Sequence, residues 1–281
     1  MDSLIPDLIA VQSSERVPLA RSPLALALCQ IRFTSVLAIS DSARVSPFQD
    51  AISDEFPVAA PANETKPQFA LGPRQGEVRQ QPSSVKWTFR DEADTWRVTL
   101  ATDYVAVETR RYADFSEFLG KLTLVLDALC QHLSPKYVTR IGLRYLNEIR
   151  GEDLDLKHIV NDKLLGPVGE EALSGSATAM EFMNQHRFSF PEGQSILLHY
   201  GYLPNGSVIR DPLPTVDTDL PFFVLDMDLS KTFESNAYMH MDVEEIRNYI
   251  DAYHTAVYSI FRWCVSEDYI AKVKGDSSDN A

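Results

Sequence analysis

Two long amphipathic segments, residues 114–133 and 242–273, constrain this fold more than any other feature of the sequence. In the first, apolar residues recur every three or four positions, as they do on one face of a helix. Such a helix must bury its apolar stripe against another layer of structure. Each segment follows three short runs rich in β-branched and aromatic residues, so we expect that layer to be a β-sheet.

The same order of expected elements occurs in both parts of the chain. Each part begins with a strand, continues with a short helix and three strands, and ends with a long helix. We therefore predict an α+β fold of internally duplicated βαβββα units, which form a twisted, mostly antiparallel sheet with both long helices on one face. The expected divisions are a flexible arm over 1–21, halves over 22–138 and 139–273 of one pseudo-symmetric domain, and a disordered tail over 274–281.

Local patterns place the individual elements. The apolar run 22–36 predicts a strand, while Ser46 and Pro47 predict the start of a short helix over 46–57. The segment 58–84 is rich in Pro, Gln, Gly and Ser, which predicts a loop with one strand near 68–71. The remaining expected strands cover residues 83–91, 95–103, 104–112, 139–150, 177–190, 194–204 and 222–233, with a short helical segment over 154–166.

The charge balance limits the function classes. The 281 residues include 26 Lys and Arg against 40 Asp and Glu, which gives a net charge of −14. A surface of this kind repels a phosphate backbone and favours solubility or a basic protein partner. The N-terminal residues lack the pattern of a secretory signal, and no apolar run approaches the ~20 residues of a membrane span. Cys29, Cys130 and Cys264 lack metal-binding spacing, so we expect a cytoplasmic protein with reduced thiols.

Familiar catalytic motifs are absent from the sequence. It contains no dinucleotide-binding Gly-rich loop, Walker A motif, nucleophile elbow or paired zinc-binding histidines. We therefore expect no cofactor and no metal, and the sequence identifies no catalytic reaction, which favours a non-catalytic protein and leaves catalysis open. One alternative comes from Arg247 and His254, which match the R-x(4–6)-H pattern of ribonucleases built from HEPN-type helical bundles. In that alternative the histidine is a general base and the arginine holds a phosphate, although those modules are all-helical and this chain is rich in strands.

The segment RIGLRYLNEIR, residues 140–150, places several charges in an expected strand. Because side chains alternate between the faces of a strand, Arg140 and Arg144 share one face. One interpretation is a ladder of internal ion pairs, in which Arg144 and Arg140 face Asp226 and Asp228 of a neighbouring strand. We expect Arg144 in particular to lie within hydrogen-bond reach of one of these carboxylates, because a buried unpaired guanidinium group is costly.

A second interpretation is an anion, nucleotide or nucleic-acid site on an open sheet face. Arg32 and Arg110 would then join Arg140 and Arg144 in lining one surface, with Asn147 as a further candidate contact. A local cluster of four guanidinium groups produces a positive potential that can exceed the effect of the negative net charge. The sequence leaves both interpretations open.

Three motifs resemble those of a sporadically distributed, uncharacterised bacterial family. They are the early PLALALCQIRF, the central RIGLRYLN with its R-x-G-x-R-Y-x-N spacing, and the late HTAVYSIF, in which His254 precedes Phe261 by seven positions. The resemblance covers about residues 22 to 270. It implies a cytoplasmic bacterial protein with the patchy distribution of defence-associated genes, and it supplies no established activity and no catalytic residues.

These observations favour a non-catalytic interaction or regulatory protein of a bacterial defence or toxin-regulating locus. A protein partner would bind to the open sheet face or to the acidic helix surface. Large aromatic side chains often anchor such interfaces, and Trp87, Trp96 and Tyr145 are the candidates here. The oligomeric state is left open.

Overall fold

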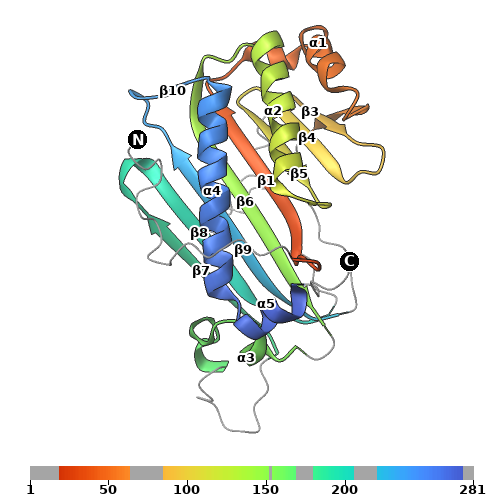
Figure 1. The fold of residues 1–281 in the computed structure, drawn as a ribbon. Coiled ribbons are helices and arrows are strands. Elements are labelled where there is room, and N and C mark those ends of the chain that lie inside the picture. The colour runs from red at the N-terminus through yellow and green to blue at the C-terminus, as the bar shows by residue number, and fades with distance from the viewer. Residues whose placement is uncertain (1–18, 64–84, 152–153, 169–179, 206–219, 275–281) are drawn as a thin grey trace, which may run out of the picture. The chain divides into compact units, whose positions relative to one another are not determined.

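The computed structural model describes residues 19–63, 85–151, 154–168, 180–205 and 220–274 (Figure 1). Within these residues the fold is α+β, with an open, mostly antiparallel sheet, as the sequence predicts. The strands are β1 (Leu24–Phe33), β2 (Val58–Asn63), β3 (Val85–Arg90), β4 (Trp96–Ala101), β5 (Tyr104–Thr109), β6 (Tyr137–Arg150), β7 (Phe182–Ser189), β8 (Gln194–Leu203), β9 (Phe222–Thr232) and β10 (Met239–His240).

Nine of the strands follow one another across the sheet in the order β2-β3-β4-β5-β1-β6-β9-β8-β7, and β10 pairs with β6. The described helices are α1 (Ser42–Ile52), α2 (Phe115–His132), α3 (Leu156–Ile159), α4 (Val243–Cys264) and α5 (Glu267–Val273).

The chain divides into two compact units, each of which is described by itself. The meander unit contains residues 28–141 and 232–243. The long-helix unit contains the described parts of 1–27, 142–231 and 244–281. Boundaries between the units fall within β1 and β6, so each of these strands contributes to both units. The other two boundaries set off only Thr232, the last residue of β9, and Val243, the first residue of α4.

In the meander unit, the predicted antiparallel meander of β3, β4 and β5 is present. The structure adds β2, which pairs antiparallel with β3. The sequence analysis missed this strand because it contains Pro61, a residue that strands accept mainly at a sheet edge. The strand expected near 68–71 lies outside the described residues.

Two helices pack in the meander unit, and one of them begins earlier than predicted. Helix α2 begins after Asp114, whose side chain accepts a hydrogen bond from the Glu117 main-chain N–H at 2.9 Å. Helix α1 begins at Ser42, not at Ser46, because Asp41 caps it by accepting from the Ala43 N–H at 3.0 Å. Pro47 therefore lies inside α1, where the apolar stripe Val45, Phe48 and Ile52 is almost fully buried.

In the long-helix unit, α4 crosses one face of strands β6, β9 and β8 (Figure 1). The sequence predicts one helix over 242–273, but the helix is broken between α4 and α5. The reason is a long-range contact: Val265 forms a β-bridge with Val160, and the Ser266 N–H donates to the Ile159 carbonyl at 2.9 Å. Ser266 then caps α5, since its hydroxyl accepts from the Tyr269 N–H at 3.0 Å.

The three cysteines are free, as expected from their spacing. Cys29 and Cys264 are buried, and burial raises the pKa of the Cys264 thiol to about 12. These thiols are therefore packed as small apolar side chains and remain protonated at neutral pH.

Candidate functional site

A row of four polar side chains crosses the long-helix unit on strands β6, β9, β8 and β7. Arg144 of β6 donates two hydrogen bonds to Asp226 of β9, from Nε to Oδ1 and from Nη2 to Oδ2, each at 2.8 Å. Asp226 is paired in register with His199 of β8, and His199 with Gln185 of β7. The ring of His199 lies 3.4 Å from Asp226 Oδ2 through Nδ1 and 2.8 Å from Gln185 Oε1 through Nε2.

The Arg144–Asp226 pair has the geometry of a buried, bidentate ion pair. The Arg144 side chain is 19% exposed and that of Asp226 is 8% exposed. Two parallel N–H···O bonds fix the planar groups against each other and satisfy the charge of the carboxylate. The expectation that Arg144 lies within hydrogen-bond reach of Asp226 is met. Because Asp226 holds this guanidinium group, Arg144 is poorly placed to bind an external anion.

The arginines expected to share one surface belong to different units. Arg32, Arg110 and Arg140 are in the meander unit, while Arg144 is in the long-helix unit. Arg140 donates to Gln30 Oε1 at 3.3 Å, and Arg32 Nη2 lies 3.5 Å from Asp103 Oδ2 in a half-exposed ion pair.

The second pair of the predicted ladder, Arg140 with Asp228, stays a prediction. Asp228 of β9 is paired in register with Leu197 of β8 and belongs to the long-helix unit. Asn147, the further candidate for ligand binding, is 5% exposed. Its Nδ2 donates to the Leu225 carbonyl at 3.2 Å, so in this structure its amide links β6 to β9.

The two residues of the ribonuclease alternative lie on α4 in different surroundings. Arg247 is exposed, whereas His254 is half-buried against the sheet. The Nδ1 atom of His254 lies 3.0 Å from the Tyr145 hydroxyl, and the centroids of the two rings are 5.8 Å apart. A general base needs a ring nitrogen that can reach its substrate, and this contact uses one of the two.

Of the three aromatic residues considered as interface anchors, Trp96 and Tyr145 are buried and present little surface to a partner, whereas Trp87 is half-buried and stays a candidate. Trp96 and Tyr145 are 5% and 6% exposed. The Nε1 of Trp87 donates to the Ile39 carbonyl at 2.7 Å, which ties its indole ring to the meander unit. Aromatic content alone does not distinguish a core residue from an anchor.

The sheet face that carries Arg144 is covered in part within the long-helix unit. Tyr145 contacts α4, so the alternating side chains of Arg144 and Leu146 point to the opposite face. On that face Leu146 belongs to a cluster with Leu26, Phe222 and Val224, in which no side chain is more than 4% exposed. This part of the face is therefore covered and does not form an exposed arginine-lined surface.

The most exposed apolar side chains of the long-helix unit lie at strand β7, a feature that the sequence analysis missed. Met180, Met183 and Phe188 are 71%, 51% and 48% exposed, and they are three of the five exposed large hydrophobic residues in the described chain. β7 ends the strand order of the sheet, and no described strand pairs with its outer side. Its sequence, FMNQHRFS, contains no acidic residue, but β1, β3, β4 and β8 also lack one, so this absence did not mark the edge strand in advance.

Strand β7 is held closely to β8 at one position. Gly201 of β8 is paired in register with Met183, and a Cβ atom at Gly201 would lie 2.1 Å from the Phe182 carbonyl oxygen. Only glycine permits this approach of the two backbones. The edge strand is therefore firmly attached on its inner side.

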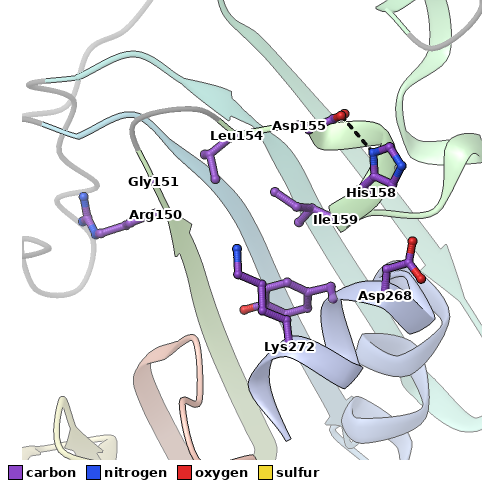
Figure 2. A pocket seen from close by; sticks show the side chains of 9 residues that line it. Arg150, Gly151, Leu154, Asp155, His158, Ile159, Asp268 and Lys272 are labelled. Atoms are coloured by element: carbon purple, nitrogen blue, oxygen red, sulfur yellow. Dashed lines mark hydrogen bonds and ion pairs between the residues drawn. The ribbon is translucent and has the colours of Figure 1, made fainter.

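A cavity of about 390 Å³ lies at the end of β6, where Gly151, Leu154, α3 and α5 line it (Figure 2). Its walls combine apolar and titratable side chains, including Leu154, Asp155, His158, Asp268, Tyr269 and Lys272. His158 Nδ1 lies 2.8 Å from Asp155 Oδ2, and this hydrogen bond is the main cause that lowers the pKa of the Asp155 carboxyl group. Figure 2 shows the Arg150 side chain directed away from the cavity.

Within the described residues, no group of three His, Cys, Asp or Glu side chains is arranged to hold a metal ion. None of the described helices is long and apolar enough to span a membrane. Comparisons of the chain with protein-family models, with curated proteins and with solved structures gave no match.

Proposed function

We propose that this chain is a non-catalytic interaction protein, which binds an extended segment of a protein partner along the outer edge of strand β7. The observation that carries the proposal is the exposure of β7: an eight-residue strand at the end of the sheet, with half-exposed Met183 and Phe188 and no strand on its outer side among the described residues. Such an edge presents main-chain N–H and C=O groups that a partner strand can pair with.

The polar side chains of the long-helix unit support a binding role over a catalytic one. Arg144 is held by Asp226, the amide of Asn147 by a main-chain carbonyl, and His254 by Tyr145. Groups that are satisfied by their own neighbours stabilise and orient the sheet. A catalytic group must instead reach the reacting atoms of a substrate.

The chemistry of β7 restricts the partner. Met183 lies opposite Gly201 and Phe188 lies opposite Ile196, so the two residues are on opposite faces of the sheet. A strand that adds to β7 with apolar residues on both faces would cover both side chains. The net charge of −14 attracts a partner of positive net charge, while β7 itself contributes only Arg187 and His186 to local charge.

The proposal is tested with Met183→Lys combined with Phe188→Lys. Charged side chains on an edge strand oppose strand addition, so the double variant should bind the partner at least tenfold more weakly. Products of neighbouring genes are the first partners to measure, because the expected setting is a defence or toxin-regulating locus. Binding is measured by titration calorimetry, and hydrogen exchange should show new protection of the amides of residues 182–189 in the complex.

The matched control is Leu37→Lys, which changes an exposed apolar residue of the meander unit, whereas β7 belongs to the long-helix unit. It should leave partner affinity within about twofold of the wild type. The proposal fails if the partner protects other strands, or if the β7 variant binds as well as the control. If sedimentation experiments show that the chain self-associates through β7, the partner at this edge is a second copy of the chain and not a different protein.

We also propose that the fold arose by duplication of a βαβββα unit. The sheet order supports it: outward from the β1–β6 neighbours, β5, β4 and β3 lie on one side and β9, β8 and β7 on the other. On both sides, the strands of one half follow each other outward in the reverse of their order along the chain. β2 is an addition at one end, and β10 pairs only two residues.

A further inference from the structure

The cavity at the end of β6 is lined by the side chain of Tyr269, which is 7% exposed. Burial raises the pKa of this phenol to about 12, so it remains protonated at neutral pH. A protonated phenol can donate a hydrogen bond, so Tyr269 can offer a donor to a ligand in this cavity.

A cation lies on the same side of α5 as this hydroxyl. Lys272 follows Tyr269 by three residues, so the two side chains leave the helix as neighbours. Figure 2 shows the Lys272 ammonium group directed toward Leu154, away from Asp268. Asp268 and Lys272 are four residues apart but form no ion pair, although this spacing favours one on a helix. One side of the cavity thus offers an ammonium group and a hydroxyl donor.

The opposite side of the cavity carries negative charge. Figure 2 shows Asp268 across from the Lys272 ammonium group, on the same side of the view as the Asp155–His158 pair. The hydrogen bond from His158 keeps the Asp155 carboxyl group ionised by lowering its pKa. Leu154 and Ile159 supply apolar wall between the two charged sides. Positive and negative groups are therefore separated across one small space.

We propose that this cavity binds a small zwitterion, a free α-amino acid with an apolar side chain. Its carboxylate would accept hydrogen bonds from Lys272 and Tyr269, its ammonium group would face Asp268, and its side chain would lie against Leu154 and Ile159. The cavity volume of about 390 Å³ falls within the range of small-molecule sites. The site is separate from the outer edge of β7 and does not depend on the function proposed for that strand.

The test is titration calorimetry of the full chain with L-leucine and with two analogues that each lack one charge. 4-Methylpentanoate lacks the ammonium group, and 3-methylbutylamine lacks the carboxylate. We expect L-leucine to bind and each analogue to bind at least tenfold more weakly, since each leaves one charged side of the cavity without a partner. Lys272→Gln and Tyr269→Phe should each weaken L-leucine binding by about tenfold for the same reason.

Lys274→Gln is the matched control, because Lys274 ends the same helix and does not line the cavity. It should bind L-leucine as the wild type does. Lys272 is exposed, so Lys272→Gln retains the fold and its result does not depend on stability. The proposal is overturned if L-leucine does not bind at millimolar concentration, if 4-methylpentanoate binds equally well, or if both lysine variants lose binding alike. The β7 double variant should bind L-leucine normally, which separates this site from the proposed function.

Discussion

At the scale of single residues, the Arg144–Asp226 pair makes the sharpest prediction. Arg144→Ala should lower the free energy of unfolding by about 3–5 kcal/mol, because it leaves the Asp226 carboxylate buried without its partner. Urea unfolding of the two proteins measures the difference. Arg187→Ala is the matched control, since Arg187 lies on the same sheet but is exposed. It should change stability by less than about 0.5 kcal/mol. A midpoint near that of the wild type for Arg144→Ala would contradict the structural role of the pair.

The sequence made this pair predictable, but not the rest of its row. Alternation along two strands places Arg144 and Asp226 on defined faces, and the cost of a buried charge then requires a partner. His199 and Gln185 complete the row only through the register of β7, β8 and β9. Register depends on which strands become neighbours, and single-residue patterns carry little information about that choice.

At the scale of elements, two glycines make opposite predictions. Gly201→Ala should destabilise the protein by about 1–3 kcal/mol, the range for overpacking, because its Cβ atom would lie 2.1 Å from the Phe182 carbonyl oxygen. Hydrogen exchange of the β7 amides should be faster in this variant.

A Cβ atom at Gly120 in α2 would meet no atom within 4 Å. Gly120→Ala should therefore stabilise the protein by about 0.5–1 kcal/mol, because alanine has a higher helix propensity than glycine. Equal effects of the two substitutions would show that backbone approach at Gly201 is not limiting.

Element types were more predictable from the sequence than element ends. Helical periodicity identified α2, and segments rich in β-branched and aromatic residues identified the β3–β5 meander and the strands of the long-helix unit. The ends of the helices depended on capping and long-range contacts, which the spacing of apolar residues does not reveal. Asp41 starts α1 before Pro47, and the bridge between Val265 and Val160 interrupts the helix predicted over 242–273. Capping and long-range hydrogen bonds decided these boundaries over local pattern.

At the scale of the whole molecule, the net charge of −14 predicts how stability responds to salt. Like charges over the surface repel in the compact state, and this repulsion is larger at low ionic strength, where the Debye length is ~30 Å at 0.01 M against ~8 Å at 0.15 M. We therefore expect the urea midpoint at pH 7 to rise when sodium chloride is raised from about 0.01 M to 0.15 M. The buried Arg144–Asp226 pair is screened much less than surface charges, so it should oppose this rise only weakly. Arg144→Ala should consequently show a salt response similar to that of the wild type, at a lower midpoint. A midpoint that falls with salt would mean that attraction in internal ion pairs outweighs the repulsion of the excess carboxylates.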